Sequence, residues 1–238
     1  MYNTITLQGK VINIKIYNYY MAFLGWLPKS LVPFVVLSVN WLVQGIIGLD
    51  KIERNFKLFL DIFLTSIFYF ILIQFISVSQ NIIVAFIISH TLNWIFNTNV
   101  HAVRSHYGGT RIEINDFVKY LRVFSLKVQK QKGIECAAAF GSFSQKRFDE
   151  FSDLDITVYQ KPGLVNCIMT CLFVMFERSK AFLMNFPLDI YILNDITKHK
   201  SIDEEPIILY DPNQKIKMLH NKTIDLEGAI KSFLDSDK

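Results

Sequence analysis

An apolar stretch lies on each side of the segment Gly141-Ser142-Phe143-Ser144-Gln145-Lys146-Arg147-Phe148-Asp149-Glu150-Phe151-Ser152-Asp153-Leu154-Asp155. We expect these stretches to form β-strands over Glu135–Phe140 and Ser152–Tyr159. Because side chains two positions apart on a strand point to the same side, Asp153 and Asp155 should lie next to each other. Neighbouring carboxylates repel unless a cation lies between them, and hard oxygen ligands favour a divalent metal ion. The segment therefore predicts a metal site, with the Gly-Ser turn offering N–H groups and a hydroxyl to the phosphates of a metal-bound nucleotide.

A third carboxylate supports this interpretation. Asp189 lies in another short apolar stretch, Leu188–Leu193, which also predicts a strand. An unpaired carboxylate in a buried strand is costly, so a lone aspartate at this position needs a stabilising partner. A shared metal site with the other two aspartates would provide that partner.

These residues resemble a known family. The pattern of Gly141-Ser142, nine further residues, Ser152-Asp153-Leu154-Asp155 and a later strand aspartate is similar to that of the DNA polymerase beta-like nucleotidyltransferase superfamily, in particular its minimal nucleotidyltransferase branch. The resemblance covers roughly residues 134 to 211 and extends to a strand over 205–211. It implies a small mixed α/β sheet flanked by helices, of the α+β or α/β class.

The resemblance also implies roles for individual residues. Asp153 and Asp155 would bind two Mg²⁺ ions, and Asp189 would share one ion and help to deprotonate the acceptor. Gly141, Ser142 and Ser152 would bind the nucleotide. The family often has glycine where this chain has Lys146, so Lys146 and Arg147 are either extra cations near the triphosphate or ordinary surface charges. Family members that only bind nucleotide leave a non-catalytic alternative open.

The first part of the chain differs in composition from the rest. Of 238 residues, 51% are apolar, and the first 97 hold only six of the 25 basic and three of the 21 acidic residues. Three segments in this part are apolar, Ser30–Leu49, Leu58–Ser79 and Asn81–Asn97. A membrane-spanning helix needs about 20 such residues. We expect an interfacial segment over 1–29, a membrane region of two to three hydrophobic helices over 30–104, and a cytosolic nucleotidyltransferase domain over 105–238.

Topology follows from the chemistry and from the flanking charges. A nucleotide-dependent domain belongs in the cytosol, and Lys51, Arg54 and Lys57 between the first two apolar segments fit the same side. The first segment either spans the membrane or enters and returns, and Pro28 and Pro33 permit the second possibility.

Polar residues form a stripe on the third apolar segment. They fall within roughly 80° of one helix face, and they are His90, Asn93, Asn97, His101 and Arg104. One hypothesis is that the stripe contacts the other apolar segments. The other is that it lines an acceptor site at the height of the lipid headgroups. A metal site from His90, His101 and His106 lacks acidic ligands at suitable spacing.

The remaining features narrow the partners. A net charge of +4 with no long basic run gives no sign of nucleic-acid binding. The three cysteines predict neither a disulfide framework nor a metal cluster. Helices are expected from Asn115 to Gly133 and over Ser142–Phe148, Val165–Phe182 and about Ile224–Leu234.

The sequence thus predicts a membrane-anchored enzyme that transfers a nucleoside monophosphate from a nucleoside triphosphate to a lipid-linked or other membrane acceptor. Two alternatives remain, modification of a partner protein and a nucleotide-binding regulatory subunit. The lipid bilayer, the triphosphate and a homo-oligomer or partner membrane protein are the expected partners.

Overall fold

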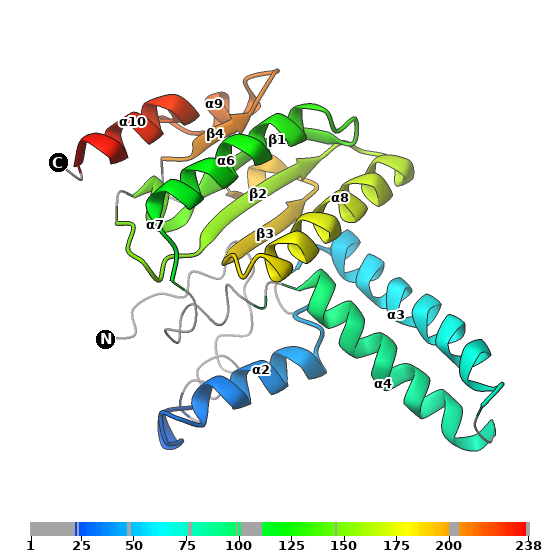
Figure 1. Cartoon of the computed structure of the whole chain (residues 1–238). Helices are drawn as coiled ribbons and strands as arrows, with labels where there is room; N and C mark the ends of the chain where they lie inside the picture. The colour runs from blue at the N-terminus through cyan, green and yellow to red at the C-terminus, as the bar shows by residue number, and fades with distance from the viewer. Residues whose placement is uncertain are drawn as a thin grey trace.

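The structure is a computed structural model, and it describes residues 22, 24–46, 49–75, 78–98, 100, 111–145, 147–199 and 205–236. Figure 1 shows two parts, a β-sheet with helices packed on it and a group of helices formed by the earlier part of the chain. The predicted interfacial segment over 1–29 and the residues His101, Arg104 and Lys146 lie wholly or largely outside the described residues.

The sheet is mixed, as the sequence predicts. Its five strands lie in the order β3-β2-β1-β4-β5. Strand β1 pairs antiparallel with both β2 and β4, whereas β2 and β3 are parallel, as are β4 and β5. The strands are β1 (Ile134–Phe140), β2 (Leu154–Gln160), β3 (Leu188–Leu193), β4 (Ile207–Tyr210) and β5 (Ile224–Asp225).

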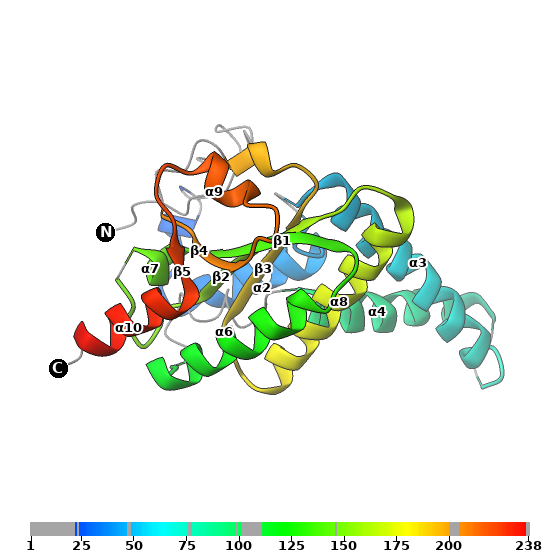
Figure 2. The same cartoon turned by 90° about the horizontal axis from the view of Figure 1, so that it is seen from above.

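The main core lies between one face of the sheet and three helices. These helices are α6 (Ile114–Gln129), α8 (Leu164–Leu183) and α10 (Leu226–Ser236), and all three lie on the same side of the sheet in Figures 1 and 2. Alternate β2 residues such as Leu154, Ile156 and Val158 point into this core. Because a strand alternates its side chains, Asp155, Thr157 and Tyr159 point to the opposite face.

The opposite face is covered by smaller elements. Helix α9 (Lys215–Leu219) and the 3₁₀ turn Ile196–His199 lie over it, and a second cluster forms around Cys136, Phe140 and Tyr159. All three cysteines are buried and free, so the prediction of no disulfide framework is confirmed.

Two predicted boundaries were wrong. The short helix after the Gly-Ser turn is α7 (Gly141–Ser144) and ends four residues before Phe148, because the Arg147 N–H turns back to the carbonyl of Ser142. The last helix begins at Leu226 instead of Ile224. Asp225 pairs with β4 and its carboxylate accepts from the Gly228 N–H, which places the helix start after it.

Three helices form the second part of the molecule. They are α2 (Val32–Leu42), α3 (Lys51–Leu72) and α4 (Val78–Asn97). In both views α3 and α4 run side by side away from the sheet (Figures 1 and 2). Among the described residues, α3 alone is long and apolar enough to cross a membrane, whereas α2 and the apolar part of α4 are shorter. Helix α3 begins seven residues before the predicted apolar segment because the Asp50 side chain caps its first turn.

A buried ion pair joins the two parts. Glu53 of α3 contacts Arg178 of α8 at 2.6 Å, and their side chains are 2% and 1% exposed. Strand β3 lies at the edge of the sheet, and this pair covers its open side: the Ile192 N–H donates to Glu53, and Arg178 donates to the carbonyl of Ile190. Since an uncovered edge leaves backbone groups without partners, the pair completes the strand that carries Asp189.

Candidate active site

Three carboxylates meet where β2 and β3 begin. Asp155 and Asp189 are register partners on the parallel strands, and Asp153 precedes β2 by one residue. Each of Asp153, Asp155 and Asp189 has an oxygen atom within 4.8 Å of one on the other two, and all three residues are half-buried. The structure therefore brings together the three acids that the sequence singles out.

Gly141 lies directly against this cluster. It follows Phe140, the register partner of Asp155, and its φ of +76° belongs to the left-handed region that favours glycine. A Cβ atom on Gly141 would lie 1.9 Å from Oδ2 of Asp155. Only glycine fits here, so its backbone can approach a group bound to the carboxylates.

The rest of the Gly-Ser turn is fixed by the core. Phe143 is buried and stacks on Phe233 with ring centroids 4.1 Å apart, and its ring also lies 4.9 Å from that of Phe117. The neighbouring Ser142 hydroxyl is buried and has no hydrogen-bond partner among the described residues. Because a buried hydroxyl without a partner is costly, this oxygen is suited to a bound ligand.

Ser152 has a different set of contacts. Its hydroxyl lies 3.1 Å from Oδ1 of Asp149 and accepts from the Asp149 N–H at 2.9 Å. The Phe151 N–H also donates to Asp149. Ser152 therefore closes the loop that leads into Asp153, and Arg147 is exposed on the same loop.

Tyr191 is a site residue that sequence reasoning missed. Its hydroxyl donates to Oδ2 of Asp189 at 2.8 Å. Burial raises the pKa of Tyr191 well above its usual value, and the nearby charges of Asp189 and Asp155 act in the same direction. The phenol therefore stays protonated and leaves the other oxygen of Asp189 for a ligand. Its position two residues after Asp189, on the same side of a strand, was the signal in the sequence.

The polar stripe on α4 lies at a helix interface. His90 Nδ1 is 2.8 Å from Asp61 Oδ2, and the Asn93 amide donates to Asp61 Oδ1 at 2.7 Å. Asn97 accepts from Arg178 at 3.3 Å. The structure thus places His90, Asn93 and Asn97 in contact with α3 and α8, in agreement with the first of the two hypotheses for the stripe.

The chemistry of the acid cluster fits a hard divalent cation. Carboxylate oxygens are the ligands that Mg²⁺ prefers, and three of them held this close repel one another unless positive charge lies among them. The close backbone approach at Gly141 and the unsatisfied Ser142 hydroxyl add groups that suit phosphate oxygens. Together these features suit phosphoryl chemistry.

Comparison with known proteins gives the same result. No curated protein matches the chain. Residues 126–215, however, match the family described as Polymerase beta, Nucleotidyltransferase. This range includes strands β1 to β4, the Gly-Ser turn and all three aspartates. The match supports the nucleotidyltransferase superfamily for this part of the chain and, with it, a general role in nucleotidyl transfer.

Proposed function

We propose that the protein is a membrane-anchored, metal-dependent nucleotidyltransferase that moves a nucleoside monophosphate from a nucleoside triphosphate to an acceptor at the membrane. The observation that carries this proposal is the convergence of Asp153, Asp155 and Asp189 beside Gly141. The family match over the same residues supports it.

Each residue of the site has a role in this reaction. Asp153 and Asp155 would hold two Mg²⁺ ions, which would supply charge neutralisation at the phosphates when bound. Asp189 would share one ion and accept the proton of the attacking hydroxyl. The acceptor oxygen forms a bond to the α-phosphorus, and the bond to pyrophosphate breaks.

The residues around the acids would bind the triphosphate. The Gly141 backbone and the Ser142 hydroxyl would contact the phosphate oxygens. Lys146 and Arg147 would add positive charge beside them, and Ser152 would fix the loop before Asp153. Tyr191 would orient Asp189 through its hydrogen bond.

The helical part of the molecule supports the membrane location. Helix α3 has 22 residues, and only 11% of its most apolar window is buried within the molecule. Its outward side chains are large and apolar, and Phe59, Ile62, Phe63 and Phe70 are all at least half exposed. Such a surface is stable in lipid and costly in water. Because nucleoside triphosphates are cytosolic, the catalytic domain would face the cytosol.

Pyrophosphate release tests the proposal directly. Detergent-solubilised protein would be supplied with Mg²⁺, each of the four nucleoside triphosphates in turn and a total membrane lipid extract. We expect release with one nucleotide, stimulated by lipid and abolished in Asp153→Ala. Glu150→Gln is the matched control, since Glu150 lies on the same loop and its one ion pair is at the surface. Equal release from wild type and Asp153→Ala would refute the proposal.

The same preparation separates the possible acceptors. A labelled nucleotide that appears in the lipid fraction identifies a lipid-linked acceptor. Label on a co-purifying protein would instead identify protein modification. Bound nucleotide without any pyrophosphate release would indicate a regulatory subunit.

A further inference from the structure

Helix α8 carries an exposed apolar face that the acid site does not use. Its buried side contacts the sheet and α6, and its later turns also contact α4. The side that points away from the sheet consists of large apolar residues, and Val165 and Phe176 are 70% and 65% exposed. The other members of this face are Leu164, Ile168, Met169, Leu172 and Leu183. A contiguous apolar surface of this kind marks a contact with lipid or protein.

The charges of α8 are arranged in the same sense. The helix contains one acid, Glu177, which is buried and pairs with Lys127 and Tyr120. Arg178 is buried in the ion pair with Glu53. No residue of the exposed face within Leu164–Leu183 is acidic, all of this helix being described. A helix that meets water on one side would normally carry charges of both signs there.

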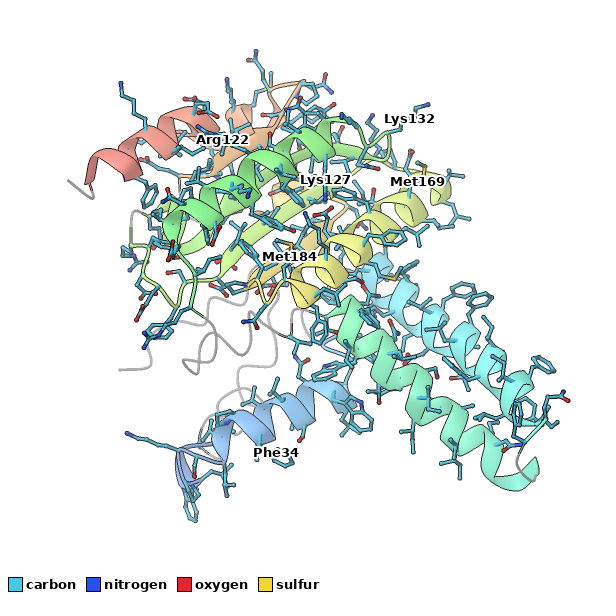
Figure 3. The ribbon with its side chains drawn as sticks, in the orientation of Figure 1. Phe34, Arg122, Lys127, Lys132, Met169 and Met184 are labelled. Carbon is cyan, nitrogen blue, oxygen red and sulfur yellow. The ribbon has the colours of Figure 1, made fainter. Side chains whose placement is uncertain are left out.

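Basic residues lie at the margin of this face. Lys130 and Lys132 are exposed in the turn after α6, and Lys161 lies beside that turn because its N–H donates to the carbonyl of Gly133. Figure 3 shows Lys132 and Met169 at the same end of the helix pair formed by α6 and α8. Lys180 is half-buried near the other end. An apolar stripe bordered by lysines complements the surface of an anionic lipid bilayer.

The position of α8 supports the same occupant. It lies on the side of the sheet from which α3 and α4 project, and it crosses near their base in both views (Figures 1 and 2). A membrane that received the α3–α4 pair would therefore meet the exposed face of α8. This continuity with the apolar surface of α3 favours lipid over a second copy of the chain.

We propose that the exposed face of α8 lies on the surface of an anionic phospholipid bilayer, as a second membrane contact made by the nucleotidyltransferase part itself. The inference rests on the membrane anchoring proposed above. It also deepens it, because α8 ends six residues before Asp189. The acid site would lie beside the bilayer surface, within reach of the headgroup of a lipid acceptor.

Spin labels on the full-length protein in vesicles test this contact. Single cysteines replace Met169 and Phe176 on α8, and Lys231→Cys on α10 is the control, since α10 covers the same face of the sheet and Lys231 is exposed. The native thiols are buried, and burial raises the pKa of Cys136 and Cys171 to about 12, so they react poorly with the label. Labelled wild type gives the background.

Vesicles of phosphatidylcholine and phosphatidylglycerol supply the bilayer. We expect the labels at 169 and 176 to lose their broadening by a water-soluble nickel chelate and to keep their broadening by oxygen, whereas the label at 231 stays accessible to the chelate. Chelate access at all three positions would overturn the proposal. Shielding from both reagents, with dipolar broadening between labels, would overturn it in favour of a second copy.

Flotation separates this failure from others. Protein that does not float with the vesicles would refute the anchoring and the α8 contact together. Protein that floats, but with α8 open to the chelate, would refute the contact alone. Neither reading depends on catalysis, so a failure of nucleotidyl transfer leaves this test intact.

Discussion

Acidic residues behave differently in the two parts of the molecule. In the helical part each buried acid contacts a group that compensates its charge, as Asp61 does with His90 and Glu53 with Arg178. In the sheet part Asp153, Asp155 and Asp189 converge on one another. Compensated acids stabilise a structure, whereas acids gathered at one point cost stability and are kept for a ligand. The comparison predicts that substitutions in the first group affect stability and those in the second affect activity.

The largest effect is expected at the centre of the acid cluster. Asp155→Asn removes one charged ligand and should lower nucleotidyl transfer about a thousandfold, or about 4 kcal/mol. Relief of repulsion between like charges should leave the free energy of unfolding unchanged or higher. Pyrophosphate release and chemical unfolding in detergent measure the two quantities. A clear loss of stability would place Asp155 with the compensated acids and break the comparison.

The next effect concerns the ion pair that covers the edge of β3. Glu53→Gln leaves the guanidinium of Arg178 buried without its counter-charge, which should lower the free energy of unfolding by about 3 kcal/mol. The double variant Glu53→Gln with Arg178→Met should be more stable than Glu53→Gln alone. Unfolding in detergent measures both. If the double variant is the less stable, the pair does not act as a compensated charge.

A smaller effect separates orientation from packing at Asp189. Tyr191→Phe keeps the ring and removes the hydroxyl that donates to Asp189, and one hydrogen bond to a charged group is worth about 1.5 kcal/mol. We expect transfer to fall about tenfold, with a higher Mg²⁺ concentration needed for half-maximal rate. Phe176→Leu on α8 is a control for loss of aromatic packing. An unchanged Mg²⁺ dependence would show that Tyr191 only packs.

Sequence patterns predicted the parts of this structure that depend on short range. The strands that carry the aspartates follow from alternating apolar residues, and the register of β2 and β3 then brings Asp155 opposite Asp189. The position of Gly141 follows from the same logic, because a tight turn after a buried strand favours glycine.

Contacts between distant residues could not be predicted in the same way. Glu53 and Arg178 are 125 residues apart, and no periodic pattern says which buried acid meets which base. Asp61 could be recognised as a lone charge in an apolar segment, and His90 as part of a polar stripe, but only the packing of α3 on α4 pairs them. The orientation of Tyr191 toward Asp189 likewise depends on how β3 is covered.

The smallest predicted effect lies in the helical part, at Asp61 and His90. His90 Nε2 is 2.9 Å from the carbonyl of Trp41, and a carbonyl can only accept, so this nitrogen carries a hydrogen. The contact between Nδ1 and Asp61 therefore contains one more proton, held by either partner. We expect a double-mutant cycle with Asp61→Asn and His90→Gln to give a coupling of about 0.6 kcal/mol, since polar contacts between helices in lipid are modest.

Activity gives the more informative half of that experiment. Both single variants should retain wild-type nucleotidyl transfer, because in this comparison the pair acts only on stability. A selective loss of transfer with unchanged unfolding would show that the α3–α4 interface takes part in the reaction. The compensated acids would then not be purely structural, and the polar stripe would have the second role that its position near the headgroups suggested.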